Sequence, residues 1–413
     1  VHVGGQRRGP RAGLRRRARG VWAPNHPARG FFRGQTPEEG GAGRVAIDVS
    51  AVPAQPAGAG VYVLRLVEAL AAGGEVDLDL VARRDDGPRW AVLAGGARVL
   101  AVAPERRPVR LAWEQAAGRR VARRLGADLW HGPHYTMPLR VRPAVVTIHD
   151  LTFFDHPEWH ERAKVPYFRA MIRASARQAA GLVCVSRHTA ERLAAVVPTR
   201  APVAVVPHGV DHERFRPEPD PGDAGRLAAL GVRAPFVAFV GTLEPRKGVP
   251  ALVRAVARLA ASHPELQLVL AGRPGWGADE VEAAVAAAPV LTGRVLRTGY
   301  VDDPTRTALL RGAAVVAYPS LEEGFGLPVL EALAVGAPVV TSTGSAMEEV
   351  AGDAAVLVPP GDEAALADAI EALLAGGPDV DRRRAAGPRT AAPYTWEASA
   401  AAHVKVYAEA AGP

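Results

Sequence analysis

Residues 314–331 read AVVAYPSLEEGFGLPVLE, and this stretch decides the fold. The apolar run 314–318 predicts a short buried strand, which leads directly into a loop containing two glycines. Pro328 is a favourable first-turn residue of a helix, so the stretch predicts a strand, a glycine-rich loop and a helix in succession. Open α/β sheets bind ligands where such loops follow the carboxyl ends of strands. We therefore expect a binding site on this loop.

The same alternation extends in both directions along the 413 residues. Short β-rich runs alternate with longer helical segments, which is typical of βαβ units and a mostly parallel sheet. The pattern restarts after a Pro-, Asp- and Gly-rich stretch at 217–222. We expect an α/β protein with two Rossmann-like domains facing across a cleft. Residues 44–210 would form the first domain, residues 211–392 the second, and residues 393–413 a helix that packs back on the first domain.

The whole net charge of +7 lies in residues 1–43, which contain nine arginines and two acids, Glu38 and Glu39. Residues 44–413 are therefore neutral, and the basic pI does not indicate a nucleic-acid partner. The first segment is rich in Gly, Pro and Arg without a hydrophobic period, so we expect it to be disordered. It begins with Val, and a mis-set translation start or a loosely attached basic arm would each explain it.

The sequence has one cysteine, Cys184, which lies in an apolar run and is expected to be buried. The absence of a disulfide framework is typical of a cytoplasmic protein. No run approaches the ~18 consecutive apolar residues that span a bilayer, and the first residues lack the apolar centre of a signal peptide. We expect a cytoplasmic protein, with a peripheral contact at the inner face of the membrane left open.

The basis for that contact is a helix expected near residues 111–125. Arginines one turn apart would concentrate positive charge on one side of it; they are Arg119, Arg120, Arg123 and Arg124. A solvated helix face is one interpretation. An anionic membrane surface or a lipid-diphosphate acceptor is the other.

Two carboxylates bracket the glycine-rich loop. Glu323 lies on the loop, and Glu331 follows eight positions later inside the helix. Gly324 and Gly326 remove side chains where backbone N–H groups could approach a ligand, and the helix N-terminus favours an anion or hydroxyl groups. This arrangement suits a ligand with hydroxyls at both ends, such as a sugar nucleotide. The alternative is a surface loop whose acids face water.

The run from Glu323 to Glu331 resembles the E-x7-E motif of the retaining glycosyltransferases of family 4, which have the two-Rossmann GT-B fold. The surrounding letters, SLEEGFGLPVLEA, match that family closely. The resemblance covers about residues 44–410, and the bacterial mannosyltransferase-like branch is the most similar. It implies that the donor sugar is held by Glu323, Gly324, Phe325 and Gly326. It also implies that Glu331 holds the ribose and that the backbone N–H of Leu327 binds a phosphate.

A second loop, residues 241–248, reads GTLEPRKG and lies between an expected strand and an expected helix. Arg246 and Lys247 at a helix start have the wrong sign for the macrodipole, and a bound diphosphate would offset that cost. Two solvated basic residues are the alternative. The resemblance implies that both neutralise the leaving diphosphate.

We expect no metal and no cofactor. Two cations already supply the charge that a metal would bring to the leaving group. The spaced acids Asp77/Asp79 and Asp379/Asp381 lie in strand-like and polar surface sequence, respectively. His131 and His134 have the spacing of half a zinc site, but no cysteine or further close-spaced histidine supports one.

His149 follows an expected buried strand at 144–148, and the adjacent Asp150 could orient or charge it. A histidine that simply closes the strand is the alternative, whereas the resemblance implies contact with the donor sugar. Gly58 and Gly60 precede the first long helix. They would let the backbone approach the diphosphate, and a tight turn is the alternative reading.

These features predict a retaining hexosyltransferase with His149, Glu323, Arg246 and Lys247 as its catalytic groups. Mannose from GDP-mannose is favoured on resemblance alone, and the acceptor would be a glycan or a lipid-linked glycan. Backbone near residues 298–301 would recognise the base. The departing phosphate would act as the base toward the acceptor, with Glu323 as covalent nucleophile the alternative. The rival functions are a nucleotide-sugar epimerase or phosphorylase of the same fold, and a noncatalytic sugar-nucleotide-binding scaffold.

Overall fold

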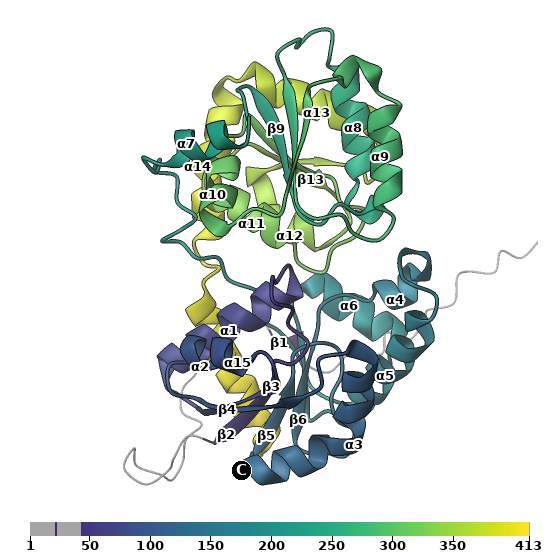
Figure 1. Cartoon of the computed structure of the whole chain (residues 1–413), viewed down its shortest axis with the longest axis vertical. Coiled ribbons are helices and arrows are strands. Elements are labelled where there is room, and N and C mark those ends of the chain that lie inside the picture. The colour runs from purple at the N-terminus through teal and green to yellow at the C-terminus, as the bar shows by residue number, and fades with distance from the viewer. Residues whose placement is uncertain (1–20, 23–42, 413) are drawn as a thin grey trace, which may run out of the picture.

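The computed structural model describes residues 21–22 and 43–412. Two α/β domains are stacked one above the other, and the chain passes between them twice (Figure 1). The expectation of two Rossmann-like domains is confirmed. No helix in the described part of the chain is long and apolar enough to cross a membrane.

The first domain contains a parallel sheet with the order β1-β8-β7-β6-β5-β2-β3-β4. Its strands are β1 (Val21–Trp22), β2 (Arg44–Asp48), β3 (Asp77–Arg83), β4 (Arg98–Ala103), β5 (Leu129–Gly132), β6 (Ala144–Ile148), β7 (Gly181–Cys184) and β8 (Val203–Val205). Strand β1 lies within the segment 1–43 that the sequence predicts to be disordered, and its two residues pair with β8. Residues 1–20 and 23–42, which include most of the predicted disordered tail, lie outside the described residues.

The second domain contains a six-stranded parallel sheet with the order β11-β10-β9-β12-β13-β14. Its strands are β9 (Phe236–Val240), β10 (Gln267–Ala271), β11 (Val295–Gly299), β12 (Val315–Tyr318), β13 (Val339–Ser342) and β14 (Val356–Val358). In both sheets the strand order reverses once, between β2 and β5 and between β9 and β12. Loops that leave the carboxyl ends of strands at such a reversal form the usual ligand crevice of this architecture.

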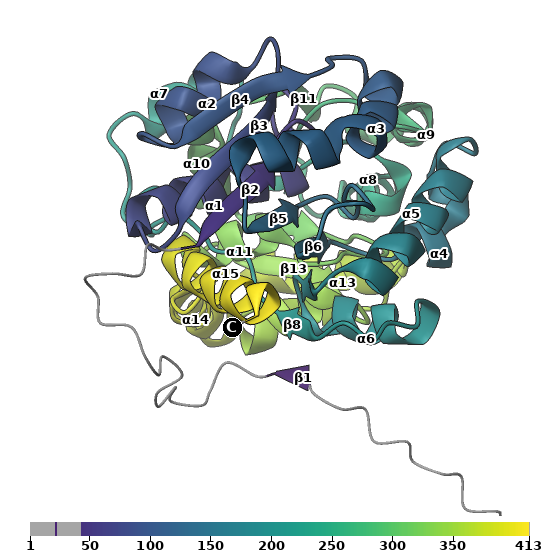
Figure 2. The same cartoon turned by 90° about the horizontal axis from the view of Figure 1, so that it is seen from below.

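Helices cover both faces of each sheet (Figures 1 and 2). Those of the first domain are α1 (Ala59–Gly73), α2 (Gly87–Leu93), α3 (Arg107–Leu125), α4 (Thr152–Asp155), α5 (Lys164–Gln178) and α6 (Arg187–Val196). Those of the second are α7 (Asp223–Ala229), α8 (Val249–Arg258), α9 (Ala278–Ala286), α10 (Asp303–Gly312), α11 (Leu327–Ala334), α12 (Ala346–Ala351), α13 (Glu363–Ala375) and α14 (Pro378–Ala391). Short 3-10 turns are η1 (Pro157–Trp159), η2 (Pro245–Lys247), η3 (Pro289–Leu291) and η4 (Gly352–Ala354).

The last helix, α15 (Trp396–Ala411), returns to the first domain as predicted and packs beside α1 (Figure 2). Buried hydrogen bonds fix it there. The Tyr407 hydroxyl lies 2.8 Å from Nδ1 of His131, and the Tyr62 hydroxyl of α1 lies 2.9 Å from Nε2 of His403. Both ring nitrogens of His131 thus have partners in the core, since Nε2 lies 2.9 Å from the Thr147 hydroxyl.

The two passages between the domains touch each other. The backbone N–H of Val210 donates to the carbonyl of Tyr394 at 3.0 Å. A β-carbon on Gly209 would fall 2.3 Å from the backbone nitrogen of Trp396, so only glycine allows this crossing. The predicted domain boundary at 210–211 lies in the first passage.

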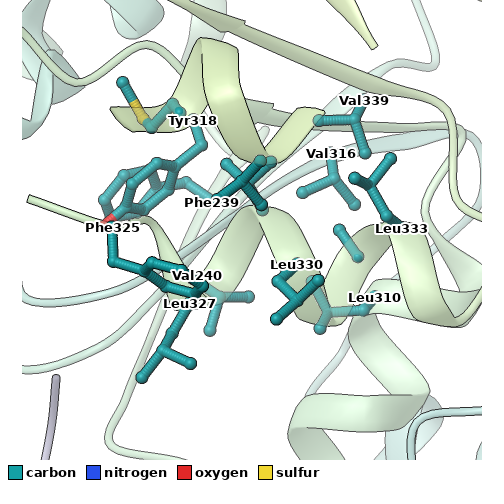
Figure 3. Packing of buried hydrophobic residues seen from close by; sticks show 14 of the residues in the cluster. Phe239, Val240, Leu310, Val316, Tyr318, Phe325, Leu327, Leu330, Leu333 and Val339 are labelled. Atoms are coloured by element: carbon teal, nitrogen blue, oxygen red, sulfur yellow. The ribbon is translucent and has the colours of Figure 1, made fainter. Parts of the chain in front are cut away.

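Helix α11 begins within the stretch 314–331 and is buried on nearly all sides. Its side chains pack with those of β9, β12 and β13 (Figure 3). Leu330 and Leu333 are fully buried, and truncation of such a leucine to alanine typically costs about 2–5 kcal/mol. This packing fixes the position of Glu331, which lies between them in sequence.

Candidate active site

Two loops that leave the neighbouring strands β9 and β12 are joined by direct contacts. The backbone N–H of Leu321 donates to the carbonyl of Arg246 at 2.8 Å, and the Ser320 hydroxyl donates to the same oxygen at 3.3 Å. Gly248 has a left-handed backbone, and a β-carbon there would lie 2.0 Å from the carbonyl oxygen of Pro319. The glycine therefore lets the basic loop lie directly against the loop that carries Glu323.

Lys247 and Glu323 form an ion pair between these loops. The ammonium group donates to Oε1 of Glu323. The same oxygen accepts hydrogen bonds from the Ser320 hydroxyl at 2.8 Å and the Tyr318 hydroxyl at 3.2 Å. Because all three donors converge on Oε1, the other carboxylate oxygen of Glu323 remains available to a ligand.

Opposing effects set the protonation of this pair. Burial raises the pKa of Glu323, but the attraction of Lys247 and Arg246 outweighs it and lowers that pKa below its ordinary value. Burial and repulsion by Arg246 lower the pKa of Lys247, although Glu323 acts against them. The site therefore keeps an ionised carboxylate beside a cation that is already partly desolvated.

Arg246 donates through Nε to the Glu244 carboxylate at 2.8 Å. Burial lowers the pKa of its guanidinium, but Glu323, Glu244 and Asp150 together raise it above the ordinary value. A bound diphosphate is therefore not the only counter-charge for the two cations, because Glu244 and Glu323 already pair with them. The terminal Nη groups of Arg246 still leave a planar fork for a further anion.

Glu331 is nearly fully buried and pairs with a cation that the sequence argument did not include. Its Oε1 lies 3.1 Å from Nη2 of Arg306 on α10. Its Oε2 and the Nε of Arg306 are both buried without a hydrogen-bond partner among the described residues. Burial raises the pKa of Glu331, and Arg306 acts against this effect. An unpaired buried oxygen costs free energy that a ligand hydroxyl would recover.

Two helices point uncapped N-termini toward the region between the domains. Helix α11 begins after Gly326, whose backbone is left-handed, and no side chain caps it. Helix α1 begins after Gly58, also with positive φ and without a side-chain cap, and a β-carbon on Gly58 would face open space. Gly60 packs against Pro56 instead. Free backbone N–H groups at Leu327 and at the start of α1 favour an anion.

His149 closes β6 and is almost fully buried. Its Nε2 lies 2.7 Å from the carbonyl of Pro133, and because a carbonyl only accepts, Nε2 carries the proton. Burial lowers the pKa of His149 despite the Pro133 carbonyl and Asp150, so the ring is neutral near pH 7. The neutral ring therefore presents Nδ1 as an acceptor. Pro133, rather than Asp150, orients it.

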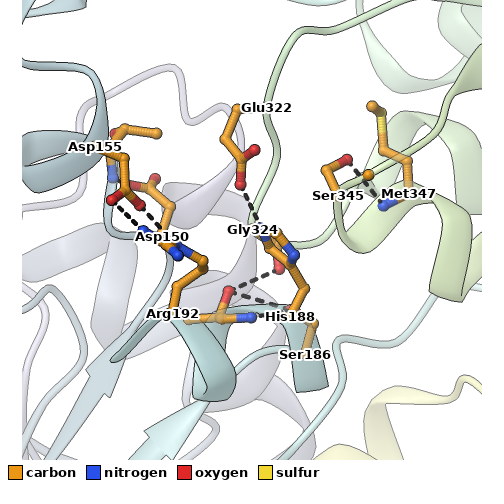
Figure 4. A network of polar contacts seen from close by, with 12 residues as sticks. Asp150, Asp155, Ser186, His188, Arg192, Glu322, Gly324, Ser345 and Met347 are labelled. Atoms are coloured by element: carbon orange, nitrogen blue, oxygen red, sulfur yellow. Dashed lines mark hydrogen bonds and ion pairs between the residues drawn. The ribbon is translucent and has the colours of Figure 1, made fainter. Parts of the chain in front are cut away.

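The two domains touch at the predicted site residues. A β-carbon on Gly324 would lie 1.6 Å from the carbonyl oxygen of His149. The hydroxyl of Thr189 on α6 lies 3.2 Å from the carbonyl oxygens of both residues. Nearby, His188 pairs with Glu322 across the same boundary (Figure 4). The structure thus brings the Gly-Phe-Gly loop against the strand end that carries His149.

Phe325 and the segment 298–301 are the remaining predicted site features. The Phe325 side chain is buried and lies with its ring centroid 4.7 Å from that of His208, so only its backbone could face a ligand. The segment 298–301 leaves the end of β11 and is partly exposed. Among residues 43–412, no group of three or more His, Cys, Asp or Glu side chains is arranged to hold a metal ion.

Comparisons with known proteins agree with this arrangement of loops. Residues 56–214 match the model of glycosyltransferase family 4, and residues 234–376 match that of the group 1 glycosyl transferases. The phosphatidyl-myo-inositol mannosyltransferase of Mycobacterium leprae is 31% identical over 373 residues, covering 85% of this chain and 93% of the relative. The chain belongs to glycosyltransferase family 4.

Two further proteins are similar to this family-4 glycosyltransferase, one in sequence and one in structure. The O-antigen chain mannosyltransferase B of Escherichia coli is 30% identical over 280 residues, covering 65% of this chain and 71% of the relative. Among solved structures, Anabaena HepE in complex with UDP-glucose superposes with a TM-score of 0.69 at 20% identity, covering 88% and 98% of the two chains. At that identity the likeness shows the shared GT-B fold.

In this family-4 enzyme, sequence reasoning missed Tyr135 as well as Arg306. Tyr135 is the one non-glycine residue with positive φ in the described part of the chain. Its hydroxyl donates to Asp150 at 2.8 Å, and its ring meets that of His149 edge-on. Backbone strain of this kind clusters at functional sites. No sequence signal distinguishes Tyr135, because strain at a tyrosine is visible only in the backbone angles.

Proposed function

We propose that this glycosyltransferase moves a mannosyl group from a nucleotide diphosphate sugar, with GDP-mannose favoured, to a hydroxyl of a glycan or lipid-linked glycan. The observation that carries the proposal is the Lys247–Glu323 ion pair beside Arg246, with the Gly-Phe-Gly loop adjoining it. The names of two relatives, both mannosyltransferases, support the choice of sugar. A UDP-sugar stays a competing donor because HepE was solved with UDP-glucose.

The diphosphate would lie between the cations and the helix N-termini. Arg246 offers its terminal Nη groups and Lys247 its remaining N–H groups, while α1 and α11 offer backbone N–H groups. The buried free oxygen of Glu331 would accept a ribose hydroxyl. Together these groups match an anion flanked by two sets of hydroxyls.

The reaction would break the bond between the anomeric carbon and the phosphate oxygen. Arg246 and Lys247 stabilise the charge that develops on the departing diphosphate. Glu323, through Oε2, and His149, through Nδ1, accept hydrogen bonds from sugar hydroxyls and hold the ring in place. The acceptor oxygen attacks from the face that the phosphate leaves, and its proton passes to that phosphate, so the configuration is retained.

The acceptor would enter beside a pair of acids in the first domain. Glu114 of α3 is nearly buried and accepts a hydrogen bond from the Thr136 hydroxyl at 3.2 Å. Burial and the nearby Asp48 raise the pKa of Glu114 to about 8. Tyr167 has a buried hydroxyl without a partner among the described residues. The protonated carboxyl group of Glu114, the carboxyl group of Asp48 and a free phenol provide donors and acceptors for acceptor hydroxyls.

We also propose that catalysis needs no metal, since Arg246 and Lys247 supply positive charge at the leaving group. A cytoplasmic location is proposed on the single buried thiol of Cys184, which is compatible with a reducing compartment. Activity that survives chelation of divalent ions would support catalysis without a metal, and activity that requires added Mg²⁺ would contradict it.

A donor screen tests the proposal. Thermal unfolding would be followed with GDP-, UDP-, ADP- and dTDP-sugars, and the best donor would then be incubated with mannosyl acceptors. We expect stabilisation by GDP-mannose and an α-linked product in the proton NMR spectrum. An inverted linkage would contradict the retaining mechanism. A free sugar phosphate or an epimerised donor without glycoside would contradict transfer itself.

A further inference from the structure

A hollow lies at the edge of the first domain that faces away from the second domain. It has a volume of about 700 Å³ and lies between the end of α3 and the connection from β5 to β6. Figure 2 views the molecule from this side. The lining consists of Arg119, Ala122, Arg123, Gly126, Ala127, Trp130, Leu139, Arg140, Val141, Arg142 and Pro143.

Four exposed arginines line the hollow without a carboxylate partner. Within residues 43–412, none of Arg119, Arg123, Arg140 and Arg142 forms an ion pair, and Arg142 donates only to the neutral amide of Gln178. Arg119 and Arg123 lie one helical turn apart, where like charges repel. Arg123 also faces the negative end of α3, but Arg140 and Arg142 come from a different segment. The hollow therefore has a concentrated positive potential, and its lining contains no acidic residue.

Trp130 provides an independent sign of a ligand. Its side chain lines the hollow and is only 1% exposed, and its indole N–H has no hydrogen-bond partner among the described residues. A buried donor without a partner is unfavourable, so an acceptor oxygen in the hollow would satisfy it. Leu139, Val141 and Pro143 complete a largely apolar wall.

We propose that this hollow binds a phosphoryl group. Guanidinium groups are suited to bidentate contact with phosphate oxygens, and the Trp130 indole would donate to another oxygen. Parallel strands β5 and β6 begin beside the hollow and end at the inter-domain site, so the bound group lies at the opposite edge of the sheet from the reaction. It would anchor or regulate the enzyme without reacting. A lipid headgroup and a soluble phosphate ester share this chemistry.

Two pairs of arginines on α3 allow a matched test. The double variant Arg119→Ala/Arg123→Ala removes two lining groups, whereas Arg120→Ala/Arg124→Ala removes the same charge from the same helix outside the hollow. Binding would be measured by calorimetry with inorganic pyrophosphate. It would also be measured by co-sedimentation with vesicles of phosphatidylglycerol and phosphatidylcholine, with pure phosphatidylcholine as the blank.

We expect the lining variant to bind at least about tenfold more weakly and the control to change less than about twofold, since a charge-assisted contact is typically worth a factor of ten. Pyrophosphate binding that the lining variant weakens and the control retains would assign a soluble ligand, because the site at Arg246 and Lys247 is intact in both variants. Binding of the anionic vesicles alone, weakened in the same way, would assign a lipid headgroup. Both support the proposal. Equal binding by the two variants, whether both are weakened or both are unchanged, or no binding in either assay, would overturn it. Transfer to a soluble acceptor should be unchanged in both variants, which separates this test from the proposed reaction.

Discussion

Gly324 lies against His149 so closely that a β-carbon on the glycine would fall 1.6 Å from the histidine carbonyl oxygen. The two residues belong to different domains, and Thr189 bridges their carbonyl groups. The contact places the Gly-Phe-Gly loop of the second domain directly on the end of strand β6. It also makes the glycine at 324 a condition for the two domains to meet in this way.

Replacing Gly324 by alanine should therefore hold the domains apart. Because backbone atoms cannot yield as a flexible side chain does, we expect Gly324→Ala to lower kcat by at least about a hundredfold, the typical cost of a misplaced reacting group. Small-angle scattering should show a larger radius of gyration. Gly225→Ala, in a helix with open space around it, is the control and should behave as wild type. Wild-type turnover in Gly324→Ala would contradict the role of this contact.

Lys247 should be required for turnover rather than for folding of the domain. Lys247→Ala removes a cation from the leaving group, and we expect kcat to fall by roughly 10²–10³-fold, as when a single stabilising donor is lost. Circular dichroism should remain that of the wild type. Arg254→Ala, which breaks only an exposed pair with Glu363, is the charge-matched control. Equal kcat values for Lys247→Ala and Arg254→Ala would exclude a role of Lys247 in stabilising the leaving group.

The buried free oxygen of Glu331 predicts an effect on donor affinity. Glu331→Gln keeps the size of the side chain but removes the charge that pairs with Arg306 and that, in the proposed donor complex, would attract a ribose hydroxyl. We expect the donor KM to rise by about tenfold with a smaller change in kcat, because a hydrogen bond to a charged group is worth about 1.5–3 kcal/mol. Glu363→Gln at the surface should leave the donor KM unchanged. An unaltered donor KM in Glu331→Gln would exclude the ribose assignment.

The loops of this site were predictable because each follows a strand in a repeated pattern. The strand, two glycines and Pro328 place Glu323 and Glu331, and the basic loop at 246–247 follows the same rule. Their partners were not predictable. Arg306 meets Glu331 only because α10 packs beside α11, and Glu244 neutralises Arg246 through a local turn. Burial, which decides the charge of His149 and Glu114, depends on segments distant in sequence.

Glu114 predicts a pH dependence of stability. Burial and Asp48 raise its pKa to about 8, so the folded protein retains a proton that the unfolded chain releases near the ordinary value of 4.5. Its contribution to stability is full below pH 4.5 and is lost as pH rises toward 8. Glu114→Gln, which stays neutral, should be increasingly more stable than wild type across that window. Urea unfolding at pH 5 and pH 8 measures this, and an equal difference at both values would contradict it.

In the proposed reaction, Lys247 and Arg246 bind the nucleoside diphosphate that departs as the sugar is transferred. Phosphorus NMR of a reaction with GDP-mannose, an acceptor and a chelator follows this step directly. We expect GDP to appear with wild-type enzyme in step with the glycoside, and both to form roughly 10²–10³-fold more slowly with Lys247→Ala. Release of GDP at the wild-type rate by Lys247→Ala, or formation of mannose phosphate in place of glycoside, would contradict it.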